Sequence, residues 1–188
     1  MAQEDRPKGT CEFCGEEMTR GGMARHLRAC PEREAAIEAA NQTARKKQAI
    51  YHLQVQDAWQ GFFWLHLEMN GNAPLAALDS YLRAIWLECC GHLSQFSIGG
   101  WSNEIPMNRP VRQVFEEGME LTHVYDFGTS SESLVKVADV RQGKPLTEHP
   151  IYLMARNHAP EITCMECDKP AEWLCGECVY EQESGALC

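Results

Sequence analysis

The feature that most constrains this chain is a set of cysteine and histidine residues near its N-terminus. Residues 11–30 read CEFCGEEMTRGGMARHLRAC, with the spacing Cys-x2-Cys-x11-His-x3-Cys. A tight CxxC turn supplies two tetrahedral zinc ligands, and a helix supplies two more when they lie at positions i and i+4. So short a segment cannot bury enough apolar surface to fold unaided. We therefore predict a CCHC-type zinc finger over residues 1–31, with ligands Cys11, Cys14, His26 and Cys30.

The helix of this finger differs from that of a finger that reads DNA bases. Base-reading fingers carry long polar side chains at the start of the helix, whereas this chain has the segment TRGG there. Glycines weaken a helix and offer no side chain to a base. Arg20, Arg25 and Arg28 remain as possible contacts to phosphate groups or to an acidic protein surface. Non-specific nucleic-acid contact, protein contact and a structural cap are all compatible with the finger.

A second cysteine cluster lies near the C-terminus, in the segment CMECDKPAEWLCGECVY. Two CxxC turns that follow closely can form one zinc site of four thiolates, and we predict such a module over residues 159–188. The predicted ligands are Cys164, Cys167, Cys175 and Cys178. The loop between the turns is shorter than in a usual zinc ribbon, and Cys188 follows, so an interleaved two-zinc layout is an alternative. Thiol exchange fits less well, because the pairs lie outside any βαβ pattern.

Between the two clusters, the hydrophobic pattern predicts an antiparallel sheet with one main packed helix. Alternating apolar residues indicate two paired strands near 51–55 and 63–69, and further strands at 119–127, 134–140 and 151–155. Apolar residues at three- and four-residue spacing indicate a helix from Leu75 to a stop at Gly91. Strands outnumber helices and most connections are short, which favours an α+β fold. We predict a helical linker over 32–47 and the α+β domain over 48–158.

The charge of the chain limits its partners. A formal net charge of −10 argues against a protein covered in nucleic-acid-binding surface, because Lys and Arg supply most of the non-specific affinity for phosphate. Residues 1–48, however, hold nine Lys and Arg against eight Asp and Glu. Any nucleic-acid contact is therefore expected at the N-terminal end, where residues 45–47 add a short basic segment.

The distribution of cysteines indicates the compartment. Ten cysteines fall in two terminal clusters and one internal pair, which is typical of thiolates kept reduced for metal rather than of a disulfide framework. The first residues, MAQEDRPKGT, contain no apolar signal-peptide core, and no apolar run is long enough to span a bilayer. We predict a cytoplasmic protein with no membrane partner.

An enzymatic interpretation rests on Cys90, His92, His123 and Asp126. Cys90 and His92 suggest a nucleophile and base, but no third group that would orient them is evident. Cys89 continues the apolar stripe of the helix, which favours packing over catalysis. The DFG tripeptide at Asp126 lacks the Gly-rich loop, strand lysine and HRD segment of protein kinases. The sequence identifies no small-molecule substrate, and an enzyme at these residues is an alternative.

Two segments of the chain resemble a known family: YLRAIWLECCGHLSQFSIGG at 81–100 and VFEEGMELTHVYDFG at 114–128. They are similar to the plasmid pRiA4b ORF-three-like family, also described as transposon passenger TnpR-like, over about residues 48–155. The resemblance implies an α+β core of antiparallel strands and helices, and flanking zinc modules like those of longer members. It implies an association with mobile elements but no defined activity.

Together these features predict a non-enzymatic protein that binds two zinc ions, one in each cluster, and presents surfaces to a macromolecular partner. The partner is a protein or a nucleic acid, and the residues do not decide between them. The alternatives are a nucleic-acid-binding regulator associated with mobile elements and an enzyme with a site near Cys90.

Overall fold

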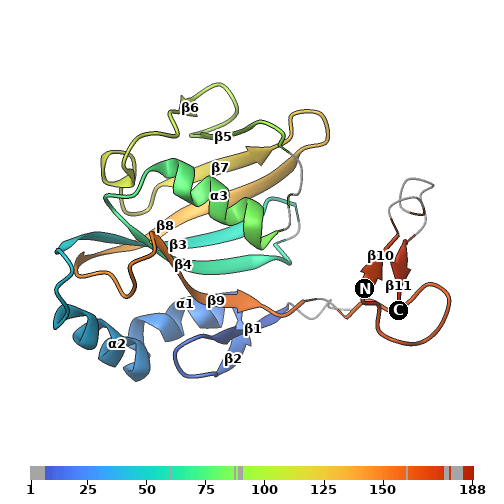
Figure 1. Ribbon diagram of the computed structural model, residues 1–188, viewed down its shortest axis with the longest axis horizontal. Helices are drawn as coiled ribbons and strands as arrows, with labels where there is room; N and C mark the ends of the chain where they lie inside the picture. The colour runs from blue at the N-terminus through green and yellow to red at the C-terminus, as the bar shows by residue number, and fades with distance from the viewer. Residues whose placement is uncertain are drawn as a thin grey trace. The chain divides into compact units, whose positions relative to one another are not determined.

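The computed structural model describes residues 7–59, 61–86, 88, 91–159, 161–175, 178 and 184–188. The chain divides into two compact units, residues 1–157 and residues 158–188. The first unit contains a nine-stranded antiparallel sheet with three α-helices in its described part (Figure 1). The fold is therefore α+β, as the sequence predicted.

The strands of the large sheet follow the order β2-β1-β9-β4-β3-β8-β7-β5-β6. In β3 and β4, Leu53 lies opposite Leu67 and Val55 opposite Leu65, so the alternation of each strand places its apolar side chains on the same face. The two strands predicted near 51–55 and 63–69 are therefore paired as expected. The strands are β1 (Lys8–Cys11), β2 (Glu17–Thr19), β3 (Gln48–Asp57), β4 (Trp64–Asn70), β5 (Ser94–Ser97), β6 (Glu104–Ile105), β7 (Glu120–Tyr125), β8 (Ser131–Gly143) and β9 (Ile151–Asn157).

One face of this sheet packs against helix α3 (Leu75–Ile85) and a short 3-10 turn, η1 (Val111–Gln113). Leu75, Leu78 and Leu82 share one side of α3 and are fully buried in the main core. This is the single main packed helix that the periodicity predicted. The sequence predicted a stop at Gly91, but the helix ends at Ile85 with Trp86 as its C-cap. Leu87, Cys89 and Cys90 lie outside the described residues.

The opposite face of the sheet is covered by the two N-terminal helices. Side chains alternate along β4, so Trp64 points away from α3. It packs in a second apolar cluster with Met23 and Leu27, and with Met154 of β9. None of the described helices combines the length and the apolar character needed to cross a bilayer. The two covering helices are α1 (Arg20–Ala29) and α2 (Pro31–Asn41).

Strand β1 joins the finger to the sheet, because it pairs with β9 along Gly9 and Cys11. A Cβ atom at Gly9 would lie 2.0 Å from the carbonyl oxygen of Arg156 and 2.6 Å from the ring of Trp64. Only glycine therefore allows the two strands to approach this closely. The finger and the sheet thus share one compact unit.

Residues 158–188 form a small unit of their own. Its strands β10 (Trp173–Leu174) and β11 (Ala186–Leu187) pair antiparallel, with Trp173 opposite Leu187. Cys188 directly follows this pair of strands. A unit of about 30 residues can bury little apolar surface, and metal ions or disulfides usually stabilise domains of this size.

Candidate metal centres

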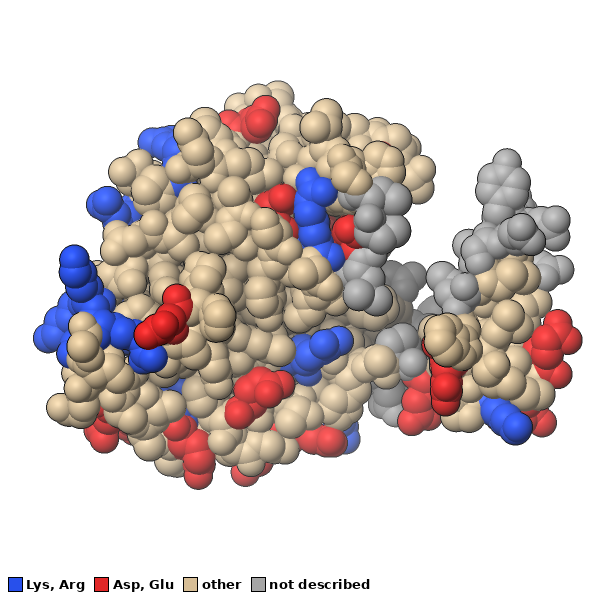
Figure 2. All heavy atoms as spheres, in the orientation of Figure 1, with Lys and Arg blue, Asp and Glu red and all other residues tan. Residues whose placement is uncertain are grey.

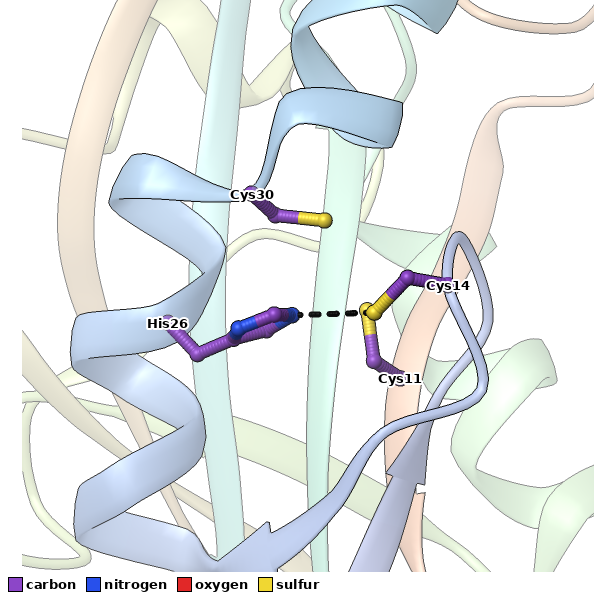
Figure 3. A group of neighbouring side chains, drawn as sticks. All are labelled: Cys11, Cys14, His26 and Cys30. Atoms are coloured by element: carbon purple, nitrogen blue, oxygen red, sulfur yellow. Dashed lines mark hydrogen bonds between the residues drawn. The ribbon is translucent and has the colours of Figure 1, made fainter.

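The side chains of Cys11, Cys14, His26 and Cys30 converge on one point (Figure 3). Their ligand atoms all lie within 4.8 Å of one another. The Cys14 Sγ atom lies 3.2 Å from His26 Nε2. Three sulfur atoms and one imidazole nitrogen are a donor set that zinc favours in tetrahedral structural sites. The group can therefore hold one metal ion.

Two of these side chains come from a turn and two from the helical segment. Cys11 ends β1, and the turn after it is closed by Gly15 N, which donates to Cys11 O at 2.9 Å, and by Cys11 N, which donates to Glu16 O at 3.0 Å. Gly15 has a φ of 77°, a conformation that favours glycine. His26 lies in the last turn of α1, and Cys30 lies between α1 and α2. The local sequence thus fixes each ligand by a hydrogen-bonded turn or a helix.

Burial makes this group depend on a cation. Cys11 and Cys30 are 0% and 2% exposed, and burial raises the pKa of Cys30 and raises that of Cys11 to about 11. A thiolate at this depth needs a positive charge beside it, and a bound metal ion provides that charge as the protons leave. Glu16 Oε2 lies 3.7 Å from His26 Nδ1, on the side of the ring away from the thiols. At this distance the exposed carboxylate lies beside the ring but is too far away for a hydrogen bond.

The C-terminal unit brings together a set of cysteines that differs from the expected one. The Sγ atoms of Cys164, Cys167 and Cys188 all lie within 4.8 Å of one another, and those of Cys167 and Cys188 are 3.6 Å apart. Cys175 and Cys178, which were expected in the same site, are joined to each other by a disulfide. Cys188 takes part because it follows β11 directly. This group can hold a second ion.

The three arginines of the finger do not form one free basic face. The guanidinium group of Arg20 donates to the side chain of Gln56 on β3, which fixes the start of α1 to the sheet. Arg25 and Arg28 are exposed. Figure 2 shows mostly uncharged and acidic side chains on the face in view, with basic side chains most numerous at its left edge. The finger therefore lacks the unobstructed helix start that a base-reading finger inserts into the major groove.

The residues of the enzymatic alternative lie in two polar groups. His123 is buried, and its Nε2 donates to Asp79 Oδ1 at 2.8 Å. Burial opposes the ionisation of Asp79, but hydrogen bonds, led by that of His123, outweigh it and lower the carboxyl pKa. His92 Nδ1 lies 3.6 Å from Asp126 Oδ2, beyond hydrogen-bond distance. Cys90 lies outside the described residues, and the two described histidines, His92 and His123, lie beside different carboxylates.

A buried histidine pair lies on the sheet face that the finger covers, and the sequence analysis did not identify it. His52 Nε2 lies 2.9 Å from His66 Nδ1, and both rings are buried. Burial, together with the charges of Arg33 and Arg28, lowers the pKa of His52 to about 3. Burial and the neighbouring His52 lower the pKa of His66 to about 3. Both histidines are therefore neutral in the folded protein. A polar residue at every second position of β3 and β4 is typical of a solvated face, so the sequence carried no local signal for this second covered face.

Acid is expected to weaken the fold through this histidine pair. The folded pKa values near 3 lie below the ordinary value of 6.5, so the unfolded chain binds more protons between these limits. The contribution of the neutral pair is complete above pH 6.5 and is lost as the pH falls toward 3. The urea midpoint should fall more between about pH 7 and about pH 5 in the wild-type protein than in the His52→Leu, His66→Leu variant. Metal loss affects both proteins alike, so an equal fall would contradict this role.

Comparison with known proteins gives a distant structural match and no family. No family model matches the chain, and no curated protein matches it. A crystal structure of a protein of unknown function from Methanosarcina mazei Go1 matches with a TM-score of 0.47 and 16% identity, over 57% of this chain and 67% of that chain. The resemblance to the plasmid ORF-three-like family therefore stays a prediction.

Proposed function

We propose that this chain is a non-enzymatic zinc protein that acts as a macromolecular interaction module, with an N-terminal ion that fixes the finger to the sheet. The observation that carries the proposal is the origin of the four ligands. Cys11 belongs to a strand of the sheet, whereas His26 and Cys30 belong to the helical cover. One ion bound by them cross-links the sheet to its cover. Four protein ligands leave no open position, which is typical of a structural rather than a catalytic zinc ion.

The interaction role is supported by an apolar surface patch at one end of β5 and β7. We call it the β5–β7 patch. Asp126 N donates to Leu93 O at 2.9 Å, which holds the two strand ends together. The rings of Trp101 and Phe127 lie 5.7 Å apart, and both are more than 40% exposed. Exposed aromatic side chains in mutual contact are enriched at protein interfaces. The patch consists of Leu93, Trp101 and Phe127.

A protein partner fits this surface better than a nucleic acid. The patch is aromatic and uncharged, whereas phosphate recognition depends on clustered Lys and Arg. The chain carries a net charge of −10. A regulator that binds nucleic acid through the finger would have to use the exposed Arg25 and Arg28. Arg20, at the start of α1, already contacts Gln56 of the sheet.

The metal content of the purified full chain tests the proposed function. We expect native mass spectrometry to find two metal ions per chain, because two groups of ligand atoms can each hold one. The substitution Cys14→Ser should reduce the content to one ion. The matched control is the double variant Cys175→Ser, Cys178→Ser, which changes two cysteines outside both groups and should retain both ions. A Cys14→Ser variant that retained as many ions as the wild-type chain would contradict the proposal.

A further inference from the structure

In the C-terminal unit, the pairing of β10 with β11 brings the thiol groups of Cys164, Cys167 and Cys188 close together. Cys188 follows β11, which pairs with β10. Met165 N donates to Ala186 O at 2.8 Å, which sets the first CxxC turn beside β11. Within that turn, Glu166 N donates to Cys164 Sγ at 3.4 Å, an interaction that orients a thiolate toward a metal ion. The three sulfur atoms are therefore held together by backbone hydrogen bonds.

Among the described residues of this unit, three thiol groups lie close enough to share one ion, whereas a tetrahedral ion takes four ligands. In the part of the unit that the structure describes, the group contains Cys164, Cys167 and Cys188. Cys175 and Cys178 are bonded to each other and so do not supply the missing thiolate. Cys164 is buried, but Cys167 and Cys188 are exposed. An ion bound by these three sulfurs would thus lie beside two exposed cysteines, whereas the N-terminal group contains only buried and half-buried ligands.

The charge of the unit indicates which donor suits the fourth position. Three thiolates around a divalent ion already leave one net negative charge, and a fourth thiolate would leave two. Residues 158–188 carry seven Asp and Glu against one Lys, so a further negative charge is unfavourable there. Figure 2 shows acidic side chains on the described part of this unit. The N-terminal group also has three thiol ligands, and the imidazole of His26 is its fourth ligand. A neutral nitrogen donor therefore fits best.

We propose that Cys164, Cys167 and Cys188 form a three-thiolate metal site whose fourth coordination position accepts an imidazole from another molecule. The site would then bind a partner through a histidine side chain, by a direct bond to the metal. This inference rests on the proposed function and deepens it, because it names the chemistry of one partner contact. The N-terminal ion, with all four positions filled, would not take part.

Cadmium NMR of the full chain tests this site, because the cadmium chemical shift reports the number of sulfur and nitrogen ligands. The chain is loaded with cadmium alone and then titrated with imidazole. We expect two cadmium signals, of which one shifts saturably with imidazole and the other stays unchanged. Cys188→Ser should remove the responsive signal. The double variant Cys175→Ser, Cys178→Ser should keep it, and circular dichroism checks that each variant is folded.

The outcomes separate this inference from the proposed function. Loss of the responsive signal in the double variant, or its survival in Cys188→Ser, would show that the ligands are the other cysteines. A C-terminal signal that ignores imidazole, or the absence of any such signal, would overturn the open position. In each of these cases an intact N-terminal signal would leave the role of the N-terminal ion standing, whereas loss of the N-terminal signal alone would overturn that role instead.

Discussion

The substitution Cys30→Ser is expected to release the N-terminal metal ion and to lower the free energy of unfolding by more than about 3 kcal/mol, a fraction of the ~10 kcal/mol that structural zinc can contribute. Cys30 is buried at the junction of α1 and α2, in the apolar cluster that contains Trp64. Without the ion, buried thiols remain and the helical cover loses its link to β1. Urea unfolding followed by tryptophan fluorescence measures the effect, because Trp64 lies beside the site.

The matched control for this substitution lies in the other cysteine group. Cys167→Ser makes the same chemical change in the C-terminal unit, which is compact on its own. The unfolding transition of the sheet should therefore stay at the wild-type midpoint. If Cys30→Ser unfolded at that same midpoint, apolar contacts alone would hold the finger on the sheet, and the structural role of the ion would be wrong.

The substitution Glu68→Ala is expected to lower the free energy of unfolding by about 3–5 kcal/mol. Glu68 is only 4% exposed on the covered face of β4. Arg141 Nε donates to its carboxylate at 3.1 Å, and Arg33 Nη2 lies 3.6 Å from the same oxygen. Removal of the carboxylate leaves two guanidinium groups close together without their counter-charge. Urea unfolding at neutral pH gives the change in free energy.

A surface ion pair provides the comparison for Glu68. Glu120 Oε1 accepts a hydrogen bond from Lys136 Nζ at 3.0 Å, but at least half of each side chain is exposed. Water and salt screen such a pair, so Glu120→Ala should leave the unfolding midpoint unchanged within error. Equal effects of the two substitutions would contradict the burial of the Glu68 group. A shift confined to Glu68→Ala would support the role of this buried carboxylate in holding α2 to the sheet.

The sequence predicted those features whose signal is local. Ligand type and spacing were enough to identify Cys11, Cys14, His26 and Cys30, because a turn and one helix bring them together. Periodicity over about ten residues was enough for the paired strands β3 and β4 and for the core face of α3. In each case the residues that determine the element lie within the element itself.

The remaining features depend on contacts between distant segments. Strand β1 has only four residues and shows no alternation, so its pairing with β9 left no periodic signal. The C-terminal cysteines are identical in type, so spacing alone could not show which of them come together. Pairing of β11 with β10 brings Cys188 to Cys164, whereas Cys175 bonds to Cys178. The covered second face of the sheet was missed because its polar residues, such as His52, look solvated in sequence.

The pairing of β1 with β9 has a consequence for the order in which the protein assembles. The finger closes through contacts local in sequence and can take up metal as soon as the ribosome releases residues 11–30. Its place on the sheet is completed only by β9, the last strand of this unit to be synthesised. The apolar side of α1 in a metal-loaded finger therefore stays uncovered until about 120 further residues have been synthesised. Only then can β1 pair with β9 and close the chain segment between them.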